Sequence, residues 1–304
     1  MSPLLALRET PATRPRRPVS FGGSVTVQSL TDEHMTEVLT FLAERPIHTV
    51  IMASFIRDNG MISPLNRGTF FACRDSAGRL EGVALIGRAT LIEARSEAAI
   101  AAFARLAQDC PIAHMIMGEQ ERIELFWNYY AEDGQAPRLV CREMLYEQRW
   151  PVAVREAVQG LRPATLDDLH LVMPVHAQMA FEESGVNPLE ADPEGFRRRC
   201  ARRIEQGRTW VWIEQGRLIF KADIAADTPE STYLEGVFVN PEERGKGYGL
   251  RCLSQLGQTL LARTRSVCVL VNERNRVAIG LYQRANYKLR SCYDTIFLHR
   301  KNDC

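Results

Sequence analysis

A stretch late in the chain, Leu234 to Gly249 with the sequence LEGVFVNPEERGKGYG, constrains the fold more than any other. Val237, Phe238 and Val239 form a compact apolar run with β-branched ends, which predicts a short covered strand. Asn240-Pro241 is a turn signal that ends this strand. Leucines then recur at helical spacing, so the stretch predicts a strand, a turn, a glycine-rich loop and a helix.

The glycine-rich loop, Arg244 to Gly249, precedes the N-terminus of the predicted helix. Glycines have no Cβ, so backbone N–H groups there can approach an anion, and the helix dipole favours negative charge. A diphosphate is the natural ligand. A P-loop would need Gly-Lys-Ser/Thr, whereas Lys246 is followed by Gly247-Tyr248. A dinucleotide fold would need G-x-G-x-x-G after the first strand, whereas this loop reads G-x-G-x-G and lies late in the chain.

The order strand, Arg-x-x-Gly-x-Gly, helix resembles the coenzyme A loop of the GCN5-related N-acetyltransferases (GNAT). The family motif is Gln/Arg-x-x-Gly-x-Gly/Ala, and Arg244, Gly247 and Gly249 match it. The resemblance implies that pantetheine pairs with the backbone of the strand and that the diphosphate lies on the amides of the loop. The coenzyme-binding residues that it implies here are Val237, Phe238, Val239, Arg244, Gly245, Lys246, Gly247, Tyr248 and Gly249.

A second family motif follows about thirty residues later. The apolar run Val267–Val271 predicts another strand, and the family pattern after it is Asn-x-x-Ala-x-x-Leu-Tyr, then Gly-Phe/Tyr. The matching residues are Asn275, Ala278, Leu281, Tyr282 and Tyr287. Asn286 replaces the usual glycine, but asparagine also tolerates the left-handed conformation. The resemblance covers residues 161–297, and it implies an α+β fold with a mixed, mostly antiparallel sheet flanked by helices.

An internal duplication is indicated by repeated order along the chain. Thr31-Asp32-Glu33 and Thr165-Leu-Asp-Asp168 each precede a predicted helix, and each half then carries a predicted hairpin. We therefore expect two tandem GNAT-like domains. The expected division is a disordered basic tail over 1–22, a degenerate domain over 23–150, a linker or crossing strand over 151–160, and a catalytic domain over 161–304.

The first half departs from the coenzyme pattern. Where the second half has its glycine loop, the first has Ile92 to Ile100, which contains no glycine and includes the acids Glu93 and Glu97. Glu121 aligns with Asn275, and Asn128 aligns with Tyr282. We therefore expect the first domain to have lost coenzyme binding. A degenerate domain followed by a competent one also occurs in the family, which supports this by analogy only.

Composition bounds the remaining functional classes. The 304 residues are enough for two domains, with 45% hydrophobic and 25% charged residues. A net charge of +1 gives no reason to expect nucleic acid or membrane partners. Eight cysteines without a C-x-x-C pair, and histidines without ligand spacing, argue against a metal site and a disulfide framework. No apolar run suits a membrane span and no signal peptide is evident, so the cytoplasm is the default location.

Acetyl transfer to an amine requires a base for the ammonium and an acid for the departing thiolate. Tyr282 is the family's usual thiolate acid; the alternative is a half-buried aromatic side chain of a helix. Asn275 is a candidate for contacting pantetheine and for capping its helix, and the two roles are compatible. Glu235 precedes the coenzyme strand and is a candidate general base, directly or through water, against the alternative of an exposed glutamate at a strand end.

Further acids are candidates for binding the acceptor amine. They are Glu182 and Glu183, after the first helix of the second domain, where the family builds its acceptor pocket, and Asp223. The alternative for Glu182 and Glu183 is a solvated helix end. A basic cluster from Arg197 to Arg208 contacts a phosphate or an acidic acceptor, or is simply a solvated helix face.

The sequence therefore predicts an acetyl-CoA-dependent N-acetyltransferase that acts on a primary amine of a small molecule, amino acid or peptide. Direct transfer in a ternary complex is expected, since no cysteine or serine stands in a nucleophile motif. Two alternatives remain: a protein or peptide acetyltransferase with the first domain as a docking platform, and a non-catalytic coenzyme A-binding module. The chain is expected to be a monomer or a homodimer.

Overall fold

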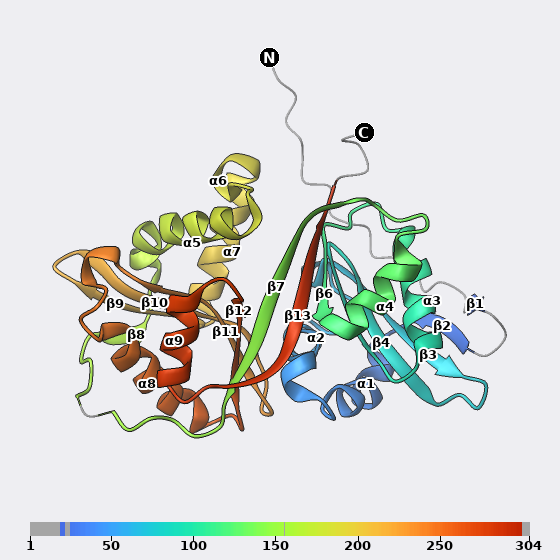
Figure 1. Ribbon diagram of the computed structural model, residues 1–304, viewed down its shortest axis with the longest axis horizontal. Coiled ribbons are helices and arrows are strands. Elements are labelled where there is room, and N and C mark those ends of the chain that lie inside the picture. The colour runs from blue at the N-terminus through green and yellow to red at the C-terminus, as the bar shows by residue number, and fades with distance from the viewer. Residues whose placement is uncertain (1–18, 22–24, 155, 300–304) are drawn as a thin grey trace, which may run out of the picture. The chain divides into compact units, whose positions relative to one another are not determined.

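The computed structural model describes residues 19–21, 25–154 and 156–299 (Figure 1). The chain divides into two compact units. The first consists of Met1–Arg142 and Tyr293–Cys304, and the second is Glu143–Cys292. Both units combine helices with a mixed sheet, so the predicted α+β class is confirmed.

The first unit is built around an antiparallel sheet with one parallel pair. Its helices are α1 (Met35–Leu42), α2 (Pro46–Asn59), α3 (Glu97–Gln108) and α4 (Gln120–Tyr130). Its strands are β1 (Val19–Phe21), β2 (Val25–Ser29), β3 (Gly68–Asp75), β4 (Leu80–Gly87), β5 (Ala89–Ala94) and β6 (Met115–Glu119), joined by parts of β7 (Pro137–Gln148) and β13 (Lys288–Leu298). The pairing runs β1-β2-β3-β4-β5-β6-β13, and only β5 and β6 are parallel.

The second unit repeats this plan. Its helices are α5 (Leu169–Ser184), α6 (Pro188–Ala191), α7 (Pro193–Glu205), α8 (Tyr248–Leu261) and α9 (Arg276–Arg284). Its strands are β8 (Leu161–Pro163), β9 (Thr209–Glu214), β10 (Arg217–Asp227), β11 (Thr232–Val239) and β12 (Val267–Asn272), with the second half of β7. The pairing runs β7-β12-β11-β10-β9-β8, and only β11 and β12 are parallel.

The boundaries of the units differ from the predicted ones. β7 continues past Arg142, and its residues Glu143–Gln148 pair with β12 of the second unit. The last strand of the chain pairs with β6 of the first unit through Tyr293–Phe297. β13 therefore completes the sheet of the first unit with its residues from Tyr293 on. A division of the chain at 150 and 161 assigns these residues to the second unit instead. The described residues between 149 and 160 form neither helix nor strand.

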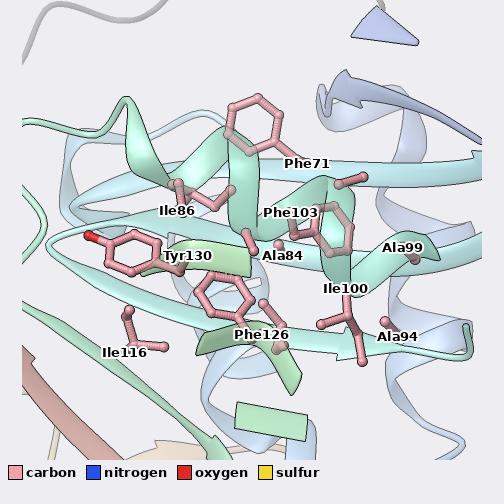
Figure 2. Packing of buried hydrophobic residues seen from close by; sticks show 14 of the residues in the cluster. Phe71, Ala84, Ile86, Ala94, Ala99, Ile100, Phe103, Ile116, Phe126 and Tyr130 are labelled. Atoms are coloured by element: carbon pink, nitrogen blue, oxygen red, sulfur yellow. The ribbon is translucent and has the colours of Figure 1, made fainter. Parts of the chain in front are cut away.

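Each sheet has helices on both faces, and strand alternation supplies both cores. On β3, Phe70 packs with the α1 and α2 cluster, whereas the next residue, Phe71, packs with α3 and α4. Figure 2 shows the second of these cores, in which Phe103, Phe126 and Tyr130 close over the sheet. Each such side chain contributes roughly 1.5–3 kcal/mol on full burial.

In the second unit, one core gathers α8 and α9 and the other gathers α5 and α7. The predicted disordered tail lies mostly outside the described residues. Val19–Phe21 of it instead forms β1, which pairs with β2.

Candidate active site

β11 separates from its parallel neighbour partway along its length. It pairs with β12 only at Thr232, Tyr233 and Leu234, whereas its other edge stays paired with β10 as far as Val239. Gly236 marks the separation: its φ is +59°, in the left-handed region, and the register with β10 shifts beside it. A non-glycine residue there would be strained, and the bulge turns the end of β11 away from β12.

Backbone groups beyond this bulge face an open edge. Asn240 donates its N–H to the Ile219 carbonyl on β10. Because backbone groups alternate along a strand, those of Val237 and Val239 point away from β10, toward an edge along which no strand pairs in the described part of the chain. The covered strand predicted here is therefore only half-buried beyond Leu234. Such an edge suits a ligand that carries amide groups.

The glycine-rich loop leads from this edge into α8. Gly245 and Gly247 have φ of +79° and +81°, and a Cβ on either would meet nothing within 4 Å. Gly249 differs, since a Cβ there would lie 3.0 Å from Val239 Cγ2. The first two glycines therefore allow the turn, and the third allows close packing of α8 on β11. Gly247 caps α8 without a side chain, so the N–H groups of the first turn face outward as an anion site requires.

The charged side chains of the loop support its conformation. Arg244 Nε donates to the Val239 carbonyl at 3.2 Å, and Lys246 Nζ donates to Glu243 at 2.8 Å. Tyr248 meets the ring of Trp212 edge-on at 4.9 Å. These contacts leave the backbone, rather than the cationic side chains, as the main surface for a diphosphate.

Tyr282 and Asn275 both lie at α9. The Asn275 side chain accepts the Ala278 N–H at 3.1 Å, which is the N-cap geometry. Tyr282 is buried in the core that Val237 and Val239 also contact, and its ring meets Tyr287 at 5.5 Å. Burial raises the pKa of Tyr282 above its ordinary value, so the phenol keeps its proton at neutral pH.

A charged network lies beside the bulge. Glu235 forms a 2.7 Å ion pair with Arg203 of α7, and Arg203 also lies 3.5 Å from Asp223. The fully buried Asp223 accepts from Lys221 and, at 2.8 Å, from Thr209. The nearby cations lower the pKa of Asp223 even though burial opposes this. Asp223 is therefore enclosed within the protein, which disfavours the predicted role of binding an acceptor amine.

The predicted acceptor acids at the end of α5 are exposed. Glu182 accepts a hydrogen bond from Gln178 at 2.7 Å. The pKa of Glu183 is raised to about 7 by desolvation and by repulsion from the carboxylates of Glu143 and Glu235. Because its side chain is exposed, we regard the repulsion as the firmer cause. The carboxylates of Glu143 on β7 and Glu235 on β11 therefore both favour the protonated form of Glu183.

The first unit fills the corresponding region with its own side chains. β5 leaves β6 after Leu91, as β11 leaves β12 after Leu234. Glu93 then occupies the position of Gly236, and it is buried between Arg45 at 3.1 Å and Arg122 at 3.0 Å. Arg122 also donates to the Ala94 carbonyl.

The direction of the backbone groups on β5 shows which edge of the strand the contact from Arg122 to Ala94 covers. Arg95 donates its N–H to Glu81 on β4, so the Ala94 carbonyl faces the opposite edge, the one that Val237 leaves open in the second unit. The first turn of α3 is capped by Ser96, which accepts from the Ala99 N–H.

Sequence reasoning missed Lys221, and it treated Arg203 only as part of a basic cluster. The sequence did contain a signal for the pair: Lys221 and Asp223 stand two residues apart in the otherwise apolar run from Leu218 to Ile224, which puts both on one buried face. Arg203 gave no comparable signal because several arginines surround it on α7.

Comparison with known proteins agrees with this geometry. Residues 222–296 match the family model described as FR47-like protein. No curated protein matches the chain by sequence. A solved structure from Drosophila has TM-score 0.67 at 12% identity and covers 91% of this chain and 99% of its own. A tandem GNAT protein from the clavulanic acid biosynthesis pathway has TM-score 0.55 at 13% identity, with coverages of 90% and 98%.

A GNAT-family acetyltransferase from Colwellia psychrerythraea has TM-score 0.54 at 12% identity and covers 90% of this chain and 99% of its own. At such identities the likeness is one of fold. Among the described residues, no helix is both long and apolar enough to cross a membrane. Within the same residues, no group of three or more His, Cys, Asp or Glu side chains is arranged to hold a metal ion. The FR47-like match lies within the second unit, and the chain as a whole shares its two-unit fold with these GNAT structures.

Proposed function

We propose that the second unit transfers an acetyl group from acetyl-CoA to a primary amine of a small molecule, amino acid or peptide. The observation that carries this proposal is that the open edge of β11 and the N-terminus of α8 are joined directly along the chain. The open edge at Val237 and Val239 leads directly, through the loop from Arg244 to Gly249, to the N-terminus of α8.

The residues of this path fit coenzyme A. The amides of pantetheine match the backbone groups of Val237 and the N–H of Val239, which point toward the open edge, whereas the Val239 carbonyl already accepts from Arg244. The diphosphate matches the N–H groups around Gly247, where no Cβ intervenes. Asn275 serves this site as the cap of α9, the helix that carries Tyr282.

The proposed chemistry joins the amine nitrogen to the acetyl carbonyl carbon, breaks the carbon–sulfur bond and moves one proton to the thiolate. Tyr282 suits the last step because it is buried and retains its proton. Glu235 is the proposed acceptor of the ammonium proton, directly or through water, and Arg203 fixes its carboxylate at 2.7 Å. Holding the reactants together in one complex supplies the remaining advantage.

Carboxylates favour a cationic acceptor. Glu183 and Glu182 lie at the end of α5, and Glu183 interacts with Glu143 and Glu235. An ammonium group relieves the repulsion among like charges, so we propose that this acidic region receives the acceptor before it loses its proton. Asp223 is left out of this proposal because it is enclosed.

For the first unit, we propose that coenzyme binding has been lost. Arg122, Glu93 and Ser96 supply from within the chain the contacts that a coenzyme would make. This leaves the first unit available as a docking surface for a larger amine-bearing partner, which is the alternative form of the proposal.

Calorimetric titration with acetyl-CoA, with ATP and NAD as controls, tests these proposals together. We expect one site per chain. Two sites would contradict the loss of binding in the first unit, and no binding would contradict the transferase. Release of free thiol from acetyl-CoA in the presence of a panel of amines then separates an enzyme from a module that only binds coenzyme.

A further inference from the structure

Four charged side chains alternate in sign beside β11. Lys221 and Asp223 have 0% side-chain exposure and form an ion pair. Asp223 lies 3.5 Å from Arg203, and Arg203 lies 2.7 Å from Glu235. Lys221 Nζ also donates to the Gly236 carbonyl at 3.3 Å. The chain of charges thus begins at the backbone of the bulge and ends at the carboxylate of the candidate base.

Stability gives little reason for this arrangement. A buried ion pair is weak evidence for stability, since desolvation opposes the attraction and apolar replacements of similar volume are often neutral or better. The strand that carries Lys221 and Asp223 is otherwise apolar from Leu218 to Ile224. Two charges placed there order their neighbours in ways that two apolar side chains would not.

The two groups that these charges order, the Gly236 backbone and the Glu235 carboxylate, both belong to β11. Gly236 has φ +59°, and its Cα leaves no room for a Cβ, which would lie 2.9 Å from Lys221 Nζ and 3.0 Å from Asp223 Oδ2. The ammonium therefore fits against the bulge itself. Arg203, held from behind by Asp223, presents its guanidinium to Glu235, which is 36% exposed.

We propose that Lys221, Asp223 and Arg203 are positioning residues for acetyl transfer: Lys221 fixes the bulge that opens the coenzyme edge, and Arg203 fixes the Glu235 carboxylate. This inference rests on the proposed function. It adds residues outside the family motifs, and it makes the placement of two reacting partners depend on one buried pair.

Other polar groups around Asp223 are accounted for. Thr209 Oγ1 donates to Asp223 Oδ1 at 2.8 Å, and His176 Nδ1 lies 3.5 Å from Oδ2. Burial, together with the charge of Lys221, lowers the pKa of His176 to about 4, so the imidazole is neutral near pH 7. The charges of the two cations, Lys221 and Arg203, then balance those of the two carboxylates, Asp223 and Glu235.

This balance defines the first test, the double variant Lys221→Met/Asp223→Asn. It removes one charge of each sign, and the asparagine still accepts from Thr209. We expect a melting temperature within about 4 °C of wild type, but a kcat about 10-fold to 100-fold lower. Hydrogen exchange of the β11 backbone after Glu235 should become faster, while that of β12 should not change. Arg263→Gln, which breaks an exposed 2.6 Å pair with Asp227 at the far end of β10, is the matched control.

The second test addresses Arg203. Removing a cation beside a carboxylate favours the protonated form. In Arg203→Met we therefore expect the acid limb of the kcat/KM profile to move to higher pH, with the KM for acetyl-CoA nearly unchanged. Arg203→Lys should restore most of the wild-type profile, which a loss of folding would not explain.

The outcomes separate the two proposals. Wild-type protein that neither binds acetyl-CoA nor releases thiol contradicts the proposed function, and hydrogen exchange of β11 then decides the positioning role alone. Wild-type activity, exchange and pH profile in the double variant and in Arg203→Met would overturn the inference. Loss of activity with slow, unchanged exchange in β11 would also overturn the role assigned to Lys221.

Discussion

The two units repeat one plan of strands and helices, but they differ at the strand that separates from its parallel neighbour, β5 in the first unit and β11 in the second. In the second unit, Gly236 opens β11 and the backbone of Val237 faces an unpaired edge. In the first unit, Glu93 stands at the equivalent position and Arg122 binds the carbonyl of Ala94. In the first unit a side chain thus satisfies the Ala94 carbonyl, whereas in the second unit the equivalent group of Val237 faces an edge with no strand partner.

This difference follows from the geometry of the fold. Strands that diverge leave backbone hydrogen-bonding groups without partners, and buried groups of this kind require some replacement. A ligand paired with the open edge, such as the proposed coenzyme, would be one replacement, and the network of arginine and glutamate in the first unit is another. The same reasoning applies to the helix that follows the separated strand. In the second unit α8 has Gly247 at its N-cap and no side-chain cap, whereas in the first unit the Ser96 side chain caps α3.

The largest expected effect comes from Gly247→Glu. A side chain and a negative charge would then occupy the anion site, and the affinity for acetyl-CoA should fall more than about 100-fold, or over roughly 2.7 kcal/mol. Calorimetry measures the loss. Gly78→Glu is the control, because Gly78 also has φ near +79° with nothing within 4 Å of a Cβ, but lies in a hairpin turn of the first unit. Equal loss in both variants would indicate backbone strain rather than blockage of the site.

Arg122→Met tests the filled region of the first unit. Glu93 would keep Arg45 but lose its second arginine, and the Ala94 carbonyl would lose its donor. Breaking such a buried network by one partner should destabilise the protein by about 3 kcal/mol, measured by calorimetric unfolding. Arg276→Met, at the aligned and exposed position of the second unit, should change stability by less than about 0.5 kcal/mol.

The same variant bears on the cause of lost binding. We expect acetyl-CoA still to bind at one site per chain, because Ser96 continues to cap α3 and no glycine loop is present. A second site in Arg122→Met would show that the arginine alone blocks the first unit.

Tyr282→Phe removes the proposed thiolate acid and keeps the ring that packs on Tyr287. We expect kcat to fall about 10-fold to 100-fold, which raises the barrier by roughly 1.4–2.7 kcal/mol, while the affinity for acetyl-CoA is retained. Tyr129→Phe in the first unit, where the hydroxyl donates to Glu97 at 2.7 Å, is the control and should leave kcat unchanged. Unaltered turnover in Tyr282→Phe would assign the proton to another group.

The sequence predicts the parts of this site that are encoded locally. The strand, the glycine loop and α8 follow from apolar runs and from residues that tolerate positive φ, so the fold class and the loop are readable from Leu234 to Gly249. The roles of Asp223 and Arg203 are not local. They arise because β10 pairs with β11 and α7 packs against that face, which brings together side chains far apart in sequence.

The boundaries of the units were missed for a related reason. Nothing in the composition of 288–298 indicates that β13 joins β6, because strand pairing between distant segments depends on the whole sheet.

The smallest expected effect concerns the acids around Glu183 in the second unit, and it appears as a pH dependence of stability. The pKa of Glu183 is raised from 4.5 to about 7 in the folded protein, so the folded state holds more protons than the unfolded state between these values. Stability therefore falls as pH rises through this window. Glu183→Gln removes the ionisation and should raise the melting temperature above pH 7, but not below pH 4.5.

Because the Glu183 side chain is exposed, solvent screens the repulsion and we expect a shift of only about 1–2 °C. Thermal melts at pH 4 and pH 8 measure it, with Glu182→Gln as the neighbouring control, which removes a charge but keeps an oxygen that accepts from Gln178. A saturating cationic amine should reduce the difference between Glu183→Gln and wild type at pH 8, since the ligand relieves the same repulsion among Glu183, Glu143 and Glu235. A difference that persists unchanged with the amine bound would place the acceptor elsewhere in the second unit.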